Sequence, residues 1–265
     1  MTEAALVLFW PAVVGYGEAA LAYAGEAFRP GRTRRPAIWG VRIGWLAQTA
    51  LLVAQAASAD GFPWATWAGS LNLFVWMCVA AYLVWGCRSS FALLGLAVMP
   101  LALVLFVLAW AGGAGTVSPS ELGSAFLVLH VGTVLAAFAG FTLAAGLAGL
   151  YLWQERRLKR REPGVLRFRV PSLVSLDRLT ARTIGVALPL LSIGLAIGLA
   201  RLVADGRAPD AVVVLGVVAW IVYGGYLAAR VELGWRGRRT AWVALAGFAL
   251  VLLLRLAVTP LVVHV

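Results

Sequence analysis

Residues 123–162 read GSAFLVLHVGTVLAAFAGFTLAAGLAGLYLWQERRLKRRE, and this stretch decides the fold class. The chain carries no charged residue between Glu121 and Glu155. This uncharged segment is longer than the apolar segment that one transmembrane helix requires. The basic block after Trp153 is typical of a cytoplasmic anchor, because lysine and arginine are retained on that side of a membrane. The stretch therefore predicts a membrane-spanning helix that ends at the cytoplasmic surface.

Composition extends this interpretation to the whole chain. Of the 265 residues, 62% are hydrophobic and 12% are charged, which indicates a polytopic membrane protein without a soluble domain. The formal net charge of +11 is interpreted as a topology signal, and we expect no nucleic-acid partner. The N-terminal residues 1–3 are acidic, so no removable signal peptide is expected. Cys78 and Cys87 lie too far apart on one helix for a disulfide, and two scattered cysteines with two histidines do not favour a zinc site.

Eight apolar spans follow one another, and each predicts one membrane-crossing helix. Their approximate ranges are 4–28, 38–57, 64–85, 91–110, 123–162, 183–203, 211–229 and 240–263. The predicted fold is all-α, a polytopic transmembrane bundle of eight helices in a single integral membrane domain over residues 1–265. Residues 1–111 hold the first four spans, and residues 118–265 hold the last four.

The basic residues predict the orientation of the chain. Nineteen of the 22 lysines and arginines fall in alternate connections, in residues 29–42, 88, 156–182 and 230–239. The opposite side holds only Arg201 and Arg207, together with acidic residues. The positive-inside rule places the basic connections in the cytoplasm, so both termini are predicted to lie outside.

The chain has two histidines, His130 and His264. His130 is 23 residues from Trp153, and His264 is 22 residues from Trp242; both tryptophans are predicted at the cytoplasmic boundary. Either spacing corresponds to roughly 33 Å of helix. Both histidines are therefore predicted at one depth on the outer face. Two imidazoles so placed could ligate one iron from both sides, as in bis-histidine haem sites. The alternative is that each is only an interfacial polar residue, and depth alone leaves both interpretations open.

Polar residues within the spans have a structural interpretation. Glu18 lies near the middle of the first span, and Arg255 lies mid-span in the last. Because intramembrane charges face the bundle interior and pair, we expect a structural ion pair in preference to a role with an anionic ligand group. Gln48, Gln55 and Asn72 are predicted to form hydrogen bonds between helices.

Two connections carry local signals. Residues 118–121, Ser-Pro-Ser-Glu, have the capping-box pattern and are expected to start the fifth span outside the membrane. Residues 171–179 are amphipathic, and we expect them to lie along the cytoplasmic surface before the sixth span.

Four features of residues 118–265 share an order and spacing that resemble one family. They are Leu129-His130-Val-Gly-Thr with the helix and basic block after it, residues 175–194, residues 234–239, and His264 at the end of the last span. Together with weaker matches at residues 60–63 and 70–73, they resemble the cytochrome c assembly membrane proteins of the CcsA and HemX type. The resemblance implies that two external histidines ligate haem, and His130 and His264 match their positions.

The chain departs from the CcsA pattern in two respects. CcsA-type proteins carry a tryptophan-rich external segment, whereas residues 204–210 here are short and contain no tryptophan. Ala228 and Asp60 stand at positions that match intramembrane histidines. These departures place the resemblance closer to the HemX-like branch, which is linked to haem biosynthesis and its regulation.

We therefore expect a haem-binding or haem-handling integral membrane protein of cytochrome c biogenesis. Haem is expected at the outer face between His130 and His264, with Arg201 and Arg207 as partners of its propionates. The expected partners are the lipid bilayer and proteins of haem biosynthesis or cytochrome c maturation, in a bacterial-type plasma (inner) membrane. No catalytic constellation is present in the sequence, so no enzymatic activity is expected. The alternatives are a HemX-like regulator or scaffold that binds no haem, and a small-molecule transporter, for which the sequence offers no clear repeat.

Overall fold

The computed structural model contains eight helices within the part of the chain that it describes. That part comprises residues 3–28, 33–58, 64, 66–86, 92–113, 124–161, 171–204, 206, 208–209 and 211–262, with the backbone alone described for residues 254–262 and at a few other helix ends. The helices are α1 (Glu3–Phe28), α2 (Arg34–Ser58), α3 (Trp67–Gly86), α4 (Ala92–Ala111), α5 (Ser124–Lys159), α6 (Leu173–Ala204), α7 (Ala211–Glu232) and α8 (Arg238–Val262). The prediction of an all-α fold with eight helices is confirmed.

Seven of these helices, α1 to α7, are long and apolar enough to cross a membrane, as judged on the described residues. The shortest, α3 and α4, have 20 residues each. At that length a helix is roughly 30 Å long, which matches the hydrocarbon thickness of a bilayer. The chain is therefore a multi-pass membrane protein. The crossing by α8 and the location of both termini outside stay predictions.

The start of α6 corrects one sequence-based expectation. Residues 171–179 do not form a separate surface segment, because α6 runs without interruption over 32 residues from Leu173 to Ala204. The backbone N–H of Ser175 donates to Ser172 Oγ at 3.3 Å, which caps the helix at its first turn. The expectation was wrong because an amphipathic pattern also fits the first turns of a membrane helix that is longer than the hydrocarbon is thick. Residues 118–121, the predicted capping box, lie outside the described residues.

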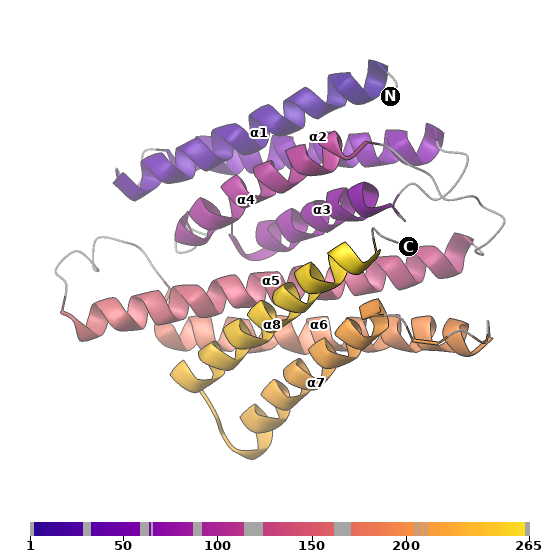
Figure 1. Cartoon of the computed structure of the whole chain (residues 1–265). Helices are drawn as coiled ribbons and strands as arrows, with labels where there is room; N and C mark the ends of the chain where they lie inside the picture. The colour runs from indigo at the N-terminus through magenta and orange to yellow at the C-terminus, as the bar shows by residue number, and fades with distance from the viewer. Residues whose placement is uncertain are drawn as a thin grey trace. The chain divides into compact units, whose positions relative to one another are not determined.

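The chain divides into two compact units, each with its own packing. Unit 1 comprises Met1–Ser124 and Arg161–Pro171 and contains α1 to α4. Unit 2 comprises Ala125–Arg160 and Ser172–Val265 and contains α5 to α8, coloured pink to yellow in Figure 1.

A buried chain of amides joins the helices of unit 1. The fully buried Gln48 side chain accepts a hydrogen bond from Tyr16 Oη at 2.5 Å and donates one to Asn72 Oδ1 at 2.7 Å. Asn72 Nδ2 in turn donates to Gln55 Oε1 at 3.4 Å. These bonds connect α1, α2 and α3, and they confirm the prediction that Gln48, Gln55 and Asn72 form hydrogen bonds between helices.

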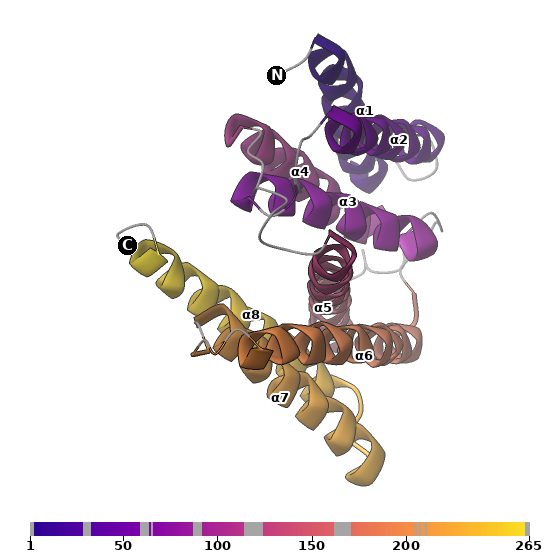
Figure 2. The same ribbon diagram turned by 90° about the vertical axis from the view of Figure 1, so that its right-hand side faces the viewer.

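Close backbone contact also holds unit 1 together. α1 and α2 lie side by side in both views (Figures 1 and 2). A Cβ atom at Gly15 would lie 2.6 Å from the backbone nitrogen of Gly44 and 2.8 Å from the carbonyl oxygen of Gly40. Glycine at these positions therefore lets the two backbones approach within contact distance, as small residues do in membrane helices.

In unit 2, α5 and α6 pack antiparallel, because Val134 meets Gly194 and Gly140 meets Ala187 in reverse order along the two helices. α7 and α8 form a hairpin that crosses α6 (Figure 2). A Cβ atom at Gly140 on α5 would lie 2.8 Å from the Ala187 Cβ on α6. Phe141 on α5 stacks on Tyr223 of α7 with ring centroids 3.8 Å apart. This packing fixes the register between α5 and α6, and so it determines which residues meet at the two ends of the pair.

Candidate functional site

The ring of His130 on α5 rests against a pair of glycines on α6. Its Nδ1 atom lies 2.8 Å from the carbonyl oxygen of Gly194. A Cβ atom at Gly198 would lie 2.7 Å from Cε1, 3.3 Å from Nδ1 and 3.6 Å from Nε2 of the same ring. Gly194 and Gly198 are one helical turn apart, and we call them the glycine pair. The imidazole occupies the space that a side chain at Gly198 would fill, while Gly194 supplies the carbonyl oxygen.

This contact assigns the tautomer of His130. A carbonyl oxygen only accepts hydrogen bonds, so Nδ1 carries the proton that is shared with Gly194. In the neutral ring the lone pair then belongs to Nε2, which makes no hydrogen bond to any described residue. Histidines that ligate metals are held in the same way, with one ring nitrogen donating to a carbonyl and the other on the metal. His130 therefore presents one ring nitrogen, Nε2, that could act as a ligand.

A cation and an aromatic ring lie at the same end of the α5–α6 pair. The guanidinium carbon of Arg201 lies 6.0 Å from the ring centroid of Phe126. Phe126 is one turn before His130 on α5, and Arg201 is three residues after Gly198 on α6. The packing thus brings Arg201 to the end of unit 2 that holds His130.

The other predicted site residues are placed only in part. His264 and Arg207 lie outside the described residues, and for Arg255 only the helical backbone is described. Glu18 is exposed on α1. The proximity of His130 to His264 and the pairing of Glu18 with Arg255 therefore stay predictions. Within the described ranges, no three His, Cys, Asp or Glu side chains gather into a group that could hold a metal ion on their own.

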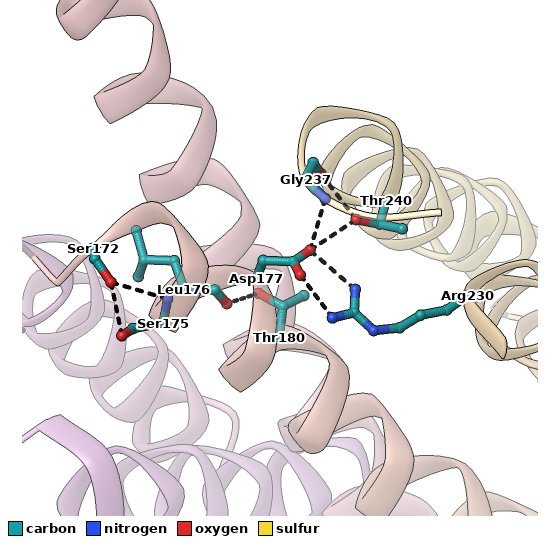
Figure 3. A network of polar contacts seen from close by, with 8 residues as sticks. All are labelled: Ser172, Ser175, Leu176, Asp177, Thr180, Arg230, Gly237 and Thr240. Atoms are coloured by element: carbon teal, nitrogen blue, oxygen red, sulfur yellow. Dashed lines mark hydrogen bonds and ion pairs between the residues drawn. The ribbon is translucent and has the colours of Figure 1, made fainter. Parts of the chain in front are cut away.

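A second polar cluster lies near the start of α6, at the opposite end of unit 2 (Figure 3). Arg230 on α7 donates two hydrogen bonds to the carboxylate of Asp177, from Nη1 at 3.0 Å and from Nη2 at 2.7 Å. The same carboxylate accepts from the backbone N–H of Gly237 at 2.9 Å and from the Thr240 hydroxyl at 3.1 Å. Three of these bonds end on Oδ1 and one on Oδ2, so the cluster cross-links α6, α7 and α8 through a single carboxylate.

The turn between α7 and α8 depends on glycine at Gly237. Its φ is +73°, a conformation that residues with a side chain rarely adopt. A Cβ atom there would also lie 2.9 Å from Tyr151 Oη. Glycine thus satisfies two constraints at once and lets the N–H point at Asp177.

Sequence reasoning missed both the glycine pair and the Asp177 cluster. The spacing Gly194-x-x-x-Gly198 is a signal for close approach of helices, although it does not say what approaches. Asp177 is the single acidic residue between Glu162 and Asp205, which marks it as a candidate for pairing. For its partner Arg230, the sequence indicates only a role in topology.

The end of α5 makes further polar contacts within unit 2. Glu155 accepts a hydrogen bond from Lys159 at 2.8 Å and lies 3.9 Å from Arg238 at the start of α8. The guanidinium carbon of Arg156 lies 5.8 Å from the ring of Trp242, also on α8. Basic and aromatic side chains therefore gather where the sequence predicts the cytoplasmic boundary.

Comparison with known proteins identifies the family. A family model described as "Cytochrome C assembly protein" matches residues 64–264. A protein named "Cytochrome c biogenesis protein CcsA" from Prochlorococcus marinus is 26% identical over 249 residues, which cover 82% of this chain and 78% of the relative. A protein of the same name from Microcystis aeruginosa is 25% identical over 264 residues, covering 80% of each chain. Another from Guillardia theta is 30% identical over 148 residues, covering 49% of each chain. No solved structure matches this chain.

The family match covers most of the chain, from the connection before α3 to the last residues, and so includes the α5–α6 pair with His130 and the hairpin of α7 and α8. The resemblance inferred from four features of the second half is thereby confirmed at the level of the family. The relatives cited here carry the CcsA name, so the HemX-like branch stays a prediction. This multi-pass membrane protein belongs to the cytochrome c assembly protein family and is a membrane protein of cytochrome c biogenesis.

Proposed function

We propose that this protein handles haem during cytochrome c biogenesis, with one haem bound at the outer face between His130 and His264. Family membership supports the haem-handling role. The observation that carries the proposal is the bond from His130 Nδ1 to the Gly194 carbonyl, because it leaves Nε2 with a lone pair and no partner among the described residues. The protein carries out no catalytic step of its own, and it acts in a bacterial-type plasma membrane.

The donor set fits haem rather than a bare metal ion. Haem already fills four positions on iron, so the protein needs to supply only one or two axial nitrogens. His130 and His264 would supply them, and Arg201 and Arg207 would bind the propionates as charge-assisted hydrogen-bond donors. Haem supplies an iron whose redox potential and retention depend on these ligands. The role of the chain is to hold the ligands at the outer end of α5 and α8 and to keep His130 in one tautomer.

A second candidate function is a HemX-like regulator or scaffold of haem biosynthesis that binds no haem. The observation that favours it is the short connection between α6, which ends at Ala204, and α7, which begins at Ala211. Six residues leave no room for the tryptophan-rich external segment of CcsA-type proteins. The family pattern has a histidine at the position of Ala228 on α7, and its replacement by alanine also favours the regulator.

A strain that lacks the gene separates the two candidates. The proposal predicts loss of covalently bound haem from c-type cytochromes, seen by peroxidase staining of denaturing gels. Wild-type protein restores the staining, and His130→Ala does not. Leu129→Ala is the matched control, since Leu129 is the neighbouring residue on α5 and is 53% exposed. Normal staining in the deletion strain, with altered levels of haem precursors, would reject the proposal in favour of the regulator.

A further inference from the structure

The nearest neighbour of Gly198 on the side where a side chain would project is the ring of His130. The three nearest atoms to a Cβ built there all belong to the ring of His130. We propose that Gly198 is a positioning residue, whose missing side chain lets the imidazole lie on α6 with Nδ1 on the Gly194 carbonyl and the lone pair on Nε2. The relevance of the imidazole placement to haem binding rests on the proposed function, whereas the placement itself does not depend on haem.

Comparison with other glycines of α6 shows that this relationship is particular to Gly198. A Cβ atom at Gly194 would lie 2.5 Å from Val134 Cγ2 and 3.3 Å from the Val134 backbone nitrogen, so that glycine serves the contact between helix backbones. A Cβ atom at Gly185 would meet nothing within 4 Å. Of these three glycines, Gly198 is therefore the one at which an added methyl group would meet the His130 ring first.

The consequence of adding one methyl group follows from the distances. Alanine at position 198 would place its Cβ 2.7 Å from His130 Cε1, well inside van der Waals contact. The ring is the flexible partner in this clash, so it must rotate away from α6. The bond of 2.8 Å to the Gly194 carbonyl is then lost. Without that acceptor the proton distributes between the two ring nitrogens, and Nε2 is no longer fixed as the unprotonated one.

The first test is nuclear magnetic resonance on haem-free, full-length protein in lipid nanodiscs. His264→Ala leaves His130 as the single histidine, so ¹⁵N labelling of histidine reports on one ring. The expected spectrum is that of the tautomer protonated at Nδ1, both in this background and with Gly185→Ala added. Adding Gly198→Ala should give a mixture of both tautomers. A ring protonated at Nε2 in the reference protein, or an unchanged spectrum with Gly198→Ala, overturns the proposal.

A second test covers the case in which Gly198→Ala folds poorly. Because the clash needs the imidazole, Gly198→Ala should lower the thermal midpoint of the wild-type protein but not that of the His130→Ala protein. Equal loss in both backgrounds means that Gly198 serves general packing and overturns the proposal. Gly185→Ala is the control in each background, and it should not lower the midpoint in either.

Haem binding distinguishes failure of this inference from failure of the proposed function. With His264 restored, Gly198→Ala should weaken haem affinity by about 10–100-fold, the usual effect of losing the hydrogen bond that orients a metal ligand. If neither the wild-type protein nor any variant binds haem, but Gly198→Ala gives the expected tautomer mixture, the proposed function fails and the positioning role stands. If wild-type protein binds haem through His130 and Gly198→Ala leaves the affinity unchanged, the positioning role fails alone.

Discussion

Asp177→Ala tests how the α6–α8 end of unit 2 is held together. The substitution removes the acceptor of two hydrogen bonds from Arg230 and of one each from Gly237 and Thr240. The guanidinium of Arg230 stays behind without its counter-ion. The α7–α8 turn also loses the acceptor of the Gly237 N–H, so both the turn and the contact between helices are weakened by one change.

The size of the effect follows from burial. Removing one partner of a buried ion pair costs about 3–5 kcal/mol, because the remaining charge stays desolvated. The side chains of Arg230 and Asp177 are 18% and 12% exposed, so water reaches them in part. We therefore expect the lower end of that range, about 3 kcal/mol. Asp177→Ala combined with Arg230→Met removes both charges and should cost less than Asp177→Ala alone.

Equilibrium unfolding in mixed micelles of maltoside and dodecyl sulfate, followed by tryptophan fluorescence, measures these free energies. Hydrogen exchange at the Gly237 amide gives a local readout, and protection there should fall with Asp177→Ala. Glu232→Ala is the control, because it removes an exposed carboxylate at the end of α7 and should change stability by less than about 0.5 kcal/mol. A loss below about 1 kcal/mol for Asp177→Ala, or additive effects in the double variant, would refute the reasoning.

Three further predictions concern unit 1 and the orientation of the chain. Gln48→Leu should lower the free energy of unfolding by about 1–2 kcal/mol in the same assay, because it leaves the Tyr16 hydroxyl and the Asn72 amide oxygen without their partner. An unchanged free energy of unfolding would show that these groups do not stabilise unit 1. A cysteine at Gly164 should be labelled only from the cytoplasm and one at Ser118 only from outside, in a background without native cysteines. Labelling of Gly164→Cys in intact cells would contradict the orientation. Glu18→Gln should destabilise the wild-type protein more than the Arg255→Gln protein if the two residues pair, and equal losses would exclude pairing.

Features governed by one segment at a time could be predicted from the sequence. Each apolar run gave a helix with bounds within four residues, except at α6, because desolvation forces every backbone group of a membrane span to bond within the segment. The bonding of Gln48 to Asn72 was also predictable, since a buried amide in a membrane has to find a partner. In both cases the physical requirement acts on the residues themselves, whatever the remaining chain does.

Features that depend on pairing between distant segments were not predictable. Asp177 and Arg230 are 53 residues apart, and nothing local distinguishes Arg230 from the other arginines of the basic connections. The same holds for His130 and Gly194, which are 64 residues apart and meet through the packing of α5 on α6, in which Gly140 also lies against Ala187. The resemblance to a family identified His130 as a candidate ligand, whereas its tautomer needed the tertiary contact.

The visible absorption spectrum of the purified protein tests the central claim most directly. Protein loaded with haem should show the Soret band of a low-spin iron with two imidazole ligands. His130→Ala and His264→Ala, made singly, should each lose haem or shift the band, because either change removes one axial nitrogen. A wild-type protein that carries haem, together with two variants that retain it with an unchanged spectrum, would contradict ligation by these histidines.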